Sequence, residues 1–162
     1  GEARYRSDRW FAWQAHEELV PLGRTAALAV TPILRTVGPQ EPLWECALLL
    51  QELWRDAAPA LPVIHDLLDA GAEDRFYLVR VLARVADRSS IEHLRPLLTI
   101  PIKDARDAEV ATQAAVALGR IGDTESIDEI EALKRKLLDD PKYEARPGLY
   151  EALELLRAAR GD

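Results

Sequence analysis

Two stretches of the chain carry the same pattern, and this internal repeat constrains the fold more than any other feature. LARVADRSSIEHLRPL spans residues 82–97 and LGRIGDTESIDEIEAL spans residues 118–133, and the two share six of their sixteen positions. Self-similarity at a period of 20 to 50 residues is typical of repeat proteins, in which each unit buries its apolar face against its neighbours. The chain is therefore expected to fold as a stack of similar units.

The repeat extends along most of the chain. One apolar position recurs at spacings of 30, 30 and 36 residues, and a second follows it by three residues in every unit. The first column consists of Leu34, Ile64, Leu94 and Ile130, and the second of Val37, Leu67, Leu97 and Leu133. Before them Leu22, Leu53, Val85 and Ile121 align, and Gly23 falls where Gly122 does. Four units result, at about residues 7–38, 42–70, 74–99 and 105–138.

Each unit is predicted to consist of two α-helices. In the fourth unit, apolar residues recur at helical spacing over residues 110–121, and Gly122 allows the left-handed conformation that commonly ends a helix. Asp123 and Thr124 are expected to cap the second helix, because their side-chain oxygens can accept hydrogen bonds from its first N–H groups.

Further signals concern the other helix ends. Ser89 and Glu92 have the spacing of a capping box in the third unit. Pro32 is expected either to delay or to kink the second helix of the first unit. Residues 143–160 are predicted to form a helix that covers the open side of the last unit. The predicted fold class is all-α, a superhelix of four helix pairs plus a C-terminal capping helix.

The composition agrees with one helical domain over residues 1–162. Hydrophobic residues make up 48% and charged residues 30% of the chain, and Leu and Ala, which favour helices, dominate the apolar set. The one cysteine, Cys46, excludes an internal disulfide and is interpreted as a core residue. Without a membrane span or signal segment, we expect a cytoplasmic protein that binds no membrane. A Gly start and the lack of Met leave open that the chain is a fragment of a longer one.

The fourth unit resembles a known repeat family. In the HEAT-like repeat of the phycobiliprotein-lyase type, the core string is Arg-x-x-Ala-Ala-x-Ala-Leu-Gly-x-Ile-Gly-Asp. The chain matches it at Ala114, Ala115, Ala117, Leu118, Gly119, Ile121, Gly122 and Asp123. Ala111 stands where the family has Arg, whereas the third unit has Arg75 there. The resemblance implies a right-handed superhelix whose second helices line a concave surface. It also implies a protein that binds other macromolecules, although a minority of the family are catalytic.

A row of polar side chains is expected on that concave surface. Four equivalent positions, each directly after a core residue of a second helix, hold Arg35, His65, Arg95 and Glu131. The residues expected beside this ladder are Asp66, His93 and Asp128. Mixed charge without an aromatic platform suits a protein partner better than a nucleic acid. We therefore predict that the ladder binds a partner protein.

A basic stripe is an alternative binding surface. Arg80, Arg84 and Arg88 are spaced at i, i+4 and i+8 on the first helix of the third unit, and Arg120 is equivalent to Arg84. Such a stripe could contact a nucleic acid or an acidic partner. However, the net charge of -7 disfavours a nucleic-acid partner and favours a solvated outer face.

Aromatic residues crowd the predicted first helix. Trp10, Phe11 and Trp13 cannot share one helix face, so one ring is expected outside, where a partner or a neighbouring domain of the same chain would cover it. Trp44 and Trp54 are interpreted as core residues, with Trp54 at a junction between repeats.

Residues that could support chemistry are sparse. The chain has three histidines, and its one His-Glu pair, His16-Glu17, lacks the further donors that a metal site needs. His65 and His93 can approach each other on neighbouring helices and are interpreted as surface residues. No nucleophile elbow or phosphate-binding glycine loop is apparent. We expect no catalytic residue, metal or cofactor, and a scaffold or adaptor that binds another protein. An accessory or lyase-like subunit of a modifying enzyme and a DNA-binding HEAT-like protein are the alternatives.

Overall fold

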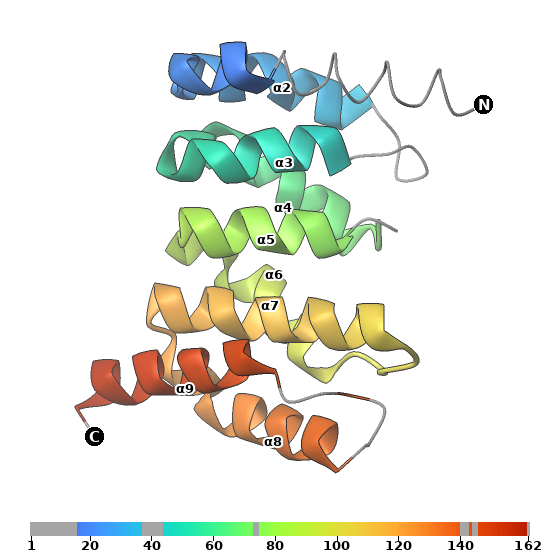
Figure 1. Ribbon diagram of the computed structural model, residues 1–162, viewed down its shortest axis with the longest axis vertical. Coiled ribbons are helices and arrows are strands. Elements are labelled where there is room, and N and C mark those ends of the chain that lie inside the picture. Colours follow the sequence, from blue (N-terminus) through green and yellow to red (C-terminus); the bar gives the residue numbers. More distant parts are fainter. Residues whose placement is uncertain (1–15, 37–43, 73–74, 140–142, 144–145, 162) are drawn as a thin grey trace.

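The helices form a stack in chain order in the computed structural model (Figure 1). The structure describes residues 16–36, 44–72, 75–139, 143 and 146–161, and within these ranges every regular element is helical, which confirms the all-α class. The elements, with η for 3₁₀ helices, are η1 (Val20–Leu22), α2 (Arg24–Thr36), α3 (Trp44–Leu53), η2 (Trp54–Ala60), α4 (Leu61–Asp69), α5 (Arg75–Val85), η3 (Arg88–Ser90), α6 (Ile91–Leu94), η4 (Arg95–Thr99), α7 (Ala105–Ile121), η5 (Thr124–Ser126), α8 (Ile127–Leu138) and α9 (Pro147–Arg160).

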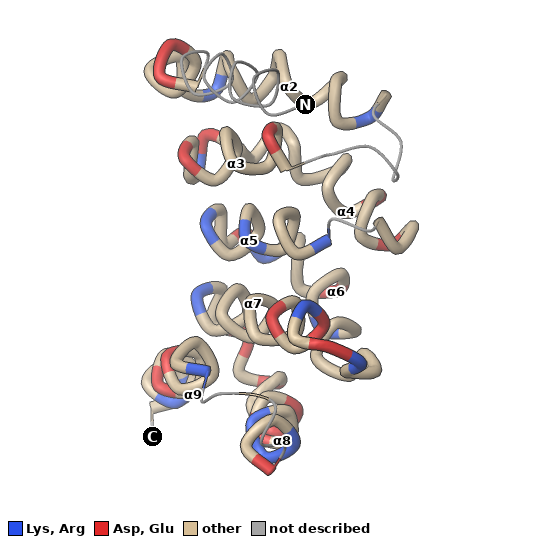
Figure 2. Tube along the Cα trace, turned by 45° about the vertical axis from the view of Figure 1, so that its right-hand side comes forward, with Lys and Arg blue, Asp and Glu red and all other residues tan. Residues whose placement is uncertain are grey.

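The stack has two layers of helices (Figure 2). The first helices of the units, α3, α5 and α7, lie one below another, and α9 continues this layer next to α7. The second helices, α2, α4, α6 and α8, form the other layer. Every extensive contact between described elements joins parts of one unit or of two adjacent units. Stability is therefore built from neighbour-to-neighbour packing, as in other repeat proteins.

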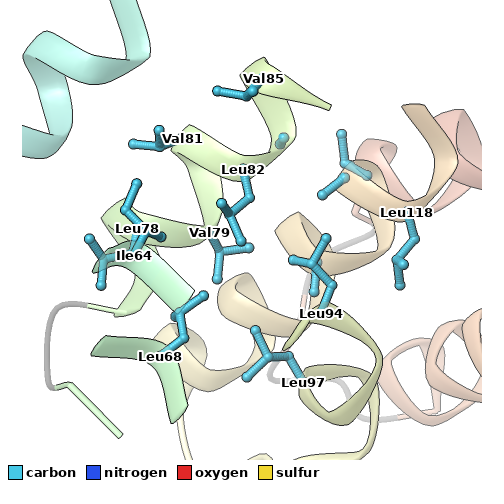
Figure 3. Close-up of a cluster of buried hydrophobic side chains, with 14 of the residues drawn as sticks. Ile64, Leu68, Leu78, Val79, Val81, Leu82, Val85, Leu94, Leu97 and Leu118 are labelled. Carbon is cyan, nitrogen blue, oxygen red and sulfur yellow. The ribbon is translucent and has the colours of Figure 1, made fainter. Parts of the chain in front are cut away.

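The described helices from α2 to α9 share one hydrophobic core, part of which is drawn in Figure 3. The predicted column of Leu34, Ile64, Leu94 and Ile130 is fully buried, with no exposed surface at any of the four side chains. Figure 3 shows how α4, α5, α6 and α7 share this core, since side chains from all four helices converge. Burying a Leu or Ile side chain contributes about 1.5–3 kcal/mol, so the column contributes roughly 6–12 kcal/mol, which is similar to the net stability of a typical domain. Cys46, which the sequence places in the core, is half-buried and packs against it. Burial raises the pKa of its thiol.

The first helix of each unit ends at a residue with positive φ. The four equivalent residues and their φ values are Gly23 at 50°, Trp54 at 51°, Ala86 at 52° and Gly122 at 82°. At Gly122 the predicted left-handed helix end is confirmed, and the N–H groups of Gly122 and Asp123 both donate to the Leu118 carbonyl, at 3.0 Å each. This conformation stops the helix and lets the second helix turn back along it.

The predicted caps of the second helices differ from the observed ones. Asp87, not Ser89, provides the cap in the third unit, because its carboxylate accepts the Ser89 N–H at 2.8 Å. Asp123 makes no capping bond in the fourth unit. Its carboxylate is instead used in a contact between units, which is described below.

Prolines have different effects in two of the second helices. α2 runs without a break through Pro32, so the predicted late start is wrong. The second helix of the third unit is shorter than predicted, because α6 gives way to 3₁₀ geometry at Arg95, directly before Pro96. Proline lacks the N–H that would continue the α-helical ladder.

The C-terminal helix α9 packs closely on α7 at a glycine. A Cβ atom built on Gly119 would lie 2.8 Å from the Cα and 3.1 Å from the carbonyl oxygen of Ala152. The two helix backbones therefore approach each other more closely than any other residue at this position would allow.

Replacing Gly119 by alanine tests this packing. Alanine is the better helix former, but its methyl group would meet the backbone of α9, so Gly119→Ala should lower the free energy of unfolding by about 1–3 kcal/mol. Urea denaturation measures the loss. Gly148→Ala is the comparison, since its Cβ would meet side-chain methyl groups of Val116 and Thr112 and no backbone atom, so it should cost less than Gly119→Ala. A Gly119→Ala protein as stable as wild type would contradict the close approach.

Candidate functional site

The predicted ladder does not form a row of free side chains. His65 contacts the third unit, Arg95 contacts the fourth unit and Glu131 contacts α9. Only Arg35, near the end of α2, is exposed without such a contact among the described residues. The position after each core residue lies at the seam between units, so the next unit is within reach of the side chain. Partner binding by these residues stays a prediction.

Arg95 makes the most extensive of these contacts. Its Nε and Nη2 donate to the two carboxylate oxygens of Asp123 at 2.9 and 2.6 Å, and Nη2 also donates to Glu125 at 2.7 Å. The Ser126 hydroxyl donates to the same Asp123 carboxylate at 2.5 Å. The hydrogen bonds from Arg95 lower the pKa of Asp123, which keeps this buried carboxylate charged. The pair is a clamp between the third and fourth units.

Two histidines form the corresponding contact between the second and third units. The His65 and His93 rings stack with centroids 4.1 Å apart and planes 12° from parallel. The His65 Nε2 and the Ser90 hydroxyl share a hydrogen bond of 2.9 Å, and His93 Nδ1 lies 3.0 Å from an Asp69 carboxylate oxygen. His65 is buried, so its interpretation as a surface residue is wrong. Burial, followed by the nearby His93, lowers the pKa of His65.

The remaining predicted residues do not converge on a site. Asp66 and Asp128 are exposed on α4 and α8. Trp10, Phe11 and Trp13 lie outside the described residues, so the aromatic first-helix surface remains a prediction. Across the described ranges, no three His, Cys, Asp or Glu side chains are placed to hold a metal.

A basic hollow opens at the ends of three successive first helices. Its volume is about 460 Å³, and it is lined by Trp54, Arg55, Arg80, Ala83, Arg84, Val85, Ala86, Gln113 and Arg120. The lining contains four arginines and no carboxylate. Three arginines of the predicted stripe lie here, whereas Arg88 is exposed on η3 and is not part of the lining. The stripe is therefore concave at its centre and not a flat outer face.

Contacts within the protein hold these arginines in place. The Arg84 guanidinium lies over the Trp54 ring, 4.5 Å from its centroid, and Arg80 lies over Phe76 at 5.5 Å. Arg120 donates to the Ala83 carbonyl at 3.3 Å and forms an ion pair with Glu151 at 3.0 Å. A positively charged group over an aromatic face is stabilised by the ring's quadrupole.

Trp54 is the unusual residue of the hollow. Its side chain is 53% exposed, so its interpretation as a core residue is wrong, although it does lie where repeats meet. It also has positive φ, a conformation that costs a non-glycine residue about 1–2 kcal/mol. Ala86 has the same conformation in the same hollow. Strained backbone that persists in a fold is often found at functional sites.

The family model of the PBS lyase HEAT-like repeat matches residues 110–136, which form most of α7 and α8. These residues form a HEAT-like repeat, which is one unit of the stack. No curated protein and no solved structure is significantly similar to it. The family suggests a helical repeat scaffold or a lyase-like role. In the part of the chain that the structure describes, no helix is both long and apolar enough to cross a membrane.

Sequence reasoning missed part of the hollow. Trp54, Arg55 and Gln113 were not candidates for binding, although they line the hollow with the predicted arginines. One signal was available: the alignment that places Gly23 opposite Gly122 also places Trp54 in that column. A large aromatic residue where other repeats have glycine indicates a helix end with an added role.

Relieving the strain at Ala86 tests the positive φ. Ala86→Gly should raise the free energy of unfolding by up to about 1 kcal/mol, because glycine adopts this conformation freely while its greater freedom in the unfolded chain offsets part of the gain. The control is Ala132→Gly, at an exposed position inside α8, which should lower it by about 1 kcal/mol. Thermal and urea unfolding measure both, and equal destabilisation by the two changes would contradict the observed φ.

The histidine pair predicts a pH dependence of stability. The pKa of His65 is below its usual value of about 6.5 in the folded state, so the unfolded chain binds more protons near that pH. The contribution of His65 is therefore complete above about pH 6.5 and declines as the pH falls below it. The charges around His65 are His93, Asp69, Asp66 and Asp87.

Replacing His65 by glutamine, which can still hydrogen-bond Ser90, should flatten the decline in unfolding free energy between pH 7 and pH 5.5. Urea titrations at several pH values measure the slope. An unchanged slope in the variant would show that other groups cause the decline.

Proposed function

We propose that this HEAT-like repeat protein is a non-catalytic scaffold that binds an acidic segment of another protein in the basic hollow. The observation that carries the proposal is the charge of the lining: four arginines without a carboxylate, in a chain whose net charge is -7. Clustered arginines repel one another, and a bound acidic segment would offset this repulsion. Electrostatic complementarity of this kind gives specificity and faster association.

The rigidity of the stack supports a binding role. The Arg95–Asp123 clamp and the His65–His93 stack fix the second-helix layer, and the Arg75–Asp107 ion pair at 2.6 Å links α5 to α7 in the first layer. The helices that carry the lining side chains therefore keep their relative positions before a partner arrives. A pre-organised surface loses little conformational entropy on binding, which favours affinity.

The chemistry of the lining supports binding over catalysis. Arginine, glutamine, tryptophan and aliphatic residues make up the lining, and none of them is a general base or nucleophile at neutral pH. A lyase-like or accessory enzymatic role is the second reading of the family, and no group in the hollow favours it.

The charge around the hollow favours a protein over duplex DNA. Figure 2 shows acidic segments on α3 and α9 on either side of the basic ends of α5 and α7. Asp56 directly follows Arg55, and Glu151 pairs with Arg120. Duplex-binding proteins neutralise many phosphates over a long surface, which these carboxylates would oppose.

A labelled peptide of six glutamates, followed by fluorescence anisotropy, tests the proposal. Arg80→Glu with Arg84→Glu should weaken binding by about 10-fold or more, because two attractive charges become repulsive. Arg106→Glu with Arg135→Glu makes the same change in net charge at exposed positions outside the hollow and should have little effect. Equal losses in the two double variants, or no binding by wild type, would contradict the proposal. Tighter binding of a 20-base-pair duplex than of the peptide would favour the DNA-binding alternative.

A further inference from the structure

Three arginines of the hollow have no acidic partner among the described residues. Arg55, Arg80 and Arg84 form no ion pair within the described part of the chain. Elsewhere in the described part of the stack, Arg75, Arg95, Arg146 and Arg157 have carboxylate partners. The described arginines without one outside the hollow are exposed and lie apart, namely Arg24 and Arg35 near opposite ends of α2, and Arg88, Arg106 and Arg135 on three other elements. The fourth arginine of the hollow, Arg120, is paired with Glu151. The hollow thus gathers unpaired positive charge at one point.

Two of the three unpaired side chains are held by aromatic rings. The guanidinium carbon of Arg84 lies 4.5 Å from the Trp54 ring centroid, and that of Arg80 lies 5.5 Å from the Phe76 ring centroid. A cation over an aromatic face is stabilised by the ring, and a guanidinium has five N–H donors. Both arginines are therefore held near the hollow without an ion pair to a carboxylate of the described chain.

The clustering is unfavourable without a ligand. Arg80 and Arg84 lie one helical turn apart on α5, and like charges at this spacing repel each other. A bound carboxylate brings one negative charge and two acceptor oxygens. A phosphoryl group brings a charge of about -1.5 to -2 and three acceptor oxygens, so it matches several arginines better.

We propose that the hollow is a receptor for the phosphoryl group of a phosphorylated side chain on the partner protein. The arginines bind the phosphate oxygens, and the exposed face of Trp54 contacts the neighbouring part of the bound peptide. The volume of about 460 Å³ accommodates a phosphorylated side chain and its neighbours, and the carboxylates beside the hollow oppose the long phosphate backbone of a duplex. This inference rests on the proposed function, since it specifies which acidic segment binds.

Three nine-residue peptides test the inference by isothermal titration calorimetry. They share glutamate-rich flanks and differ only at the central residue, which is phosphoserine, glutamate or serine. Phosphoserine should bind at least about 10-fold more tightly than glutamate, because it adds charge-assisted hydrogen bonds. This advantage should grow between pH 5.5 and pH 7.5, as the phosphate loses its second proton near pH 6.

Variants in which glutamine, a neutral residue, replaces arginine locate the site. Arg80→Gln with Arg84→Gln should remove the advantage of phosphoserine, whereas Arg106→Gln with Arg135→Gln should retain it. Arg55→Gln is the milder second variant, because Arg55 is exposed and its loss leaves the stacked pairs intact; it should reduce the advantage. Circular dichroism melts establish that each variant is folded.

The outcomes separate this inference from the proposed function. Equal binding of the phosphoserine and glutamate peptides would overturn the phosphoryl receptor and leave the acidic-segment scaffold in place. Binding of none of the peptides would overturn both. Displacement of the phosphopeptide by an equal concentration of inorganic phosphate, or tighter binding of duplex DNA through Arg80 and Arg84, would overturn the assignment to a phosphorylated protein.

Discussion

A residue with positive φ ends the first helix of each of the four units, and both the stack and the basic hollow depend on it. This conformation stops the helix, so that the second helix can turn back and the pair can present an apolar face to the next unit. The outer units use glycine, Gly23 and Gly122, which adopts it without strain. The inner units use Trp54 and Ala86, whose side chains then line the hollow. The feature that closes each hairpin thus also places Trp54 at the surface.

Much of the fold could be predicted because its signals act over a few residues. The apolar columns gave the buried faces, and Gly122 marked a helix end. The observed structure differs from the predicted one where two interactions compete for the same residue or segment. Asp123 can cap its own helix or bind Arg95 of the preceding unit, and a bidentate, charge-assisted contact is the stronger choice. Pro96 likewise ended the α-helical geometry of the third unit, although the apolar spacing continued through it.

The site was less accessible from the sequence. Helical spacing placed Arg80 and Arg84 on one face, and the alignment placed Arg120 beside them, but a stripe and a hollow have the same spacing. Trp54 was assigned to the core because large aromatic residues are usually buried. Its exposure follows from its backbone conformation and from the two units beside it. The contacts of the ladder residues with the next unit were missed for a related reason. An alignment cannot tell whether a side chain such as His65 points outward or toward the next unit.

Backbone nuclear magnetic resonance at Trp54 and Ala86 tests this view most directly. Cα and Cβ chemical shifts, with the coupling between the amide and α protons, report φ for each residue in solution. We expect positive φ at both residues, with helical values at Leu53 and Val85 directly before them. Helical values at Trp54 and Ala86 would mean that the first helices run on, and that the arginines and the indole ring do not meet in one hollow.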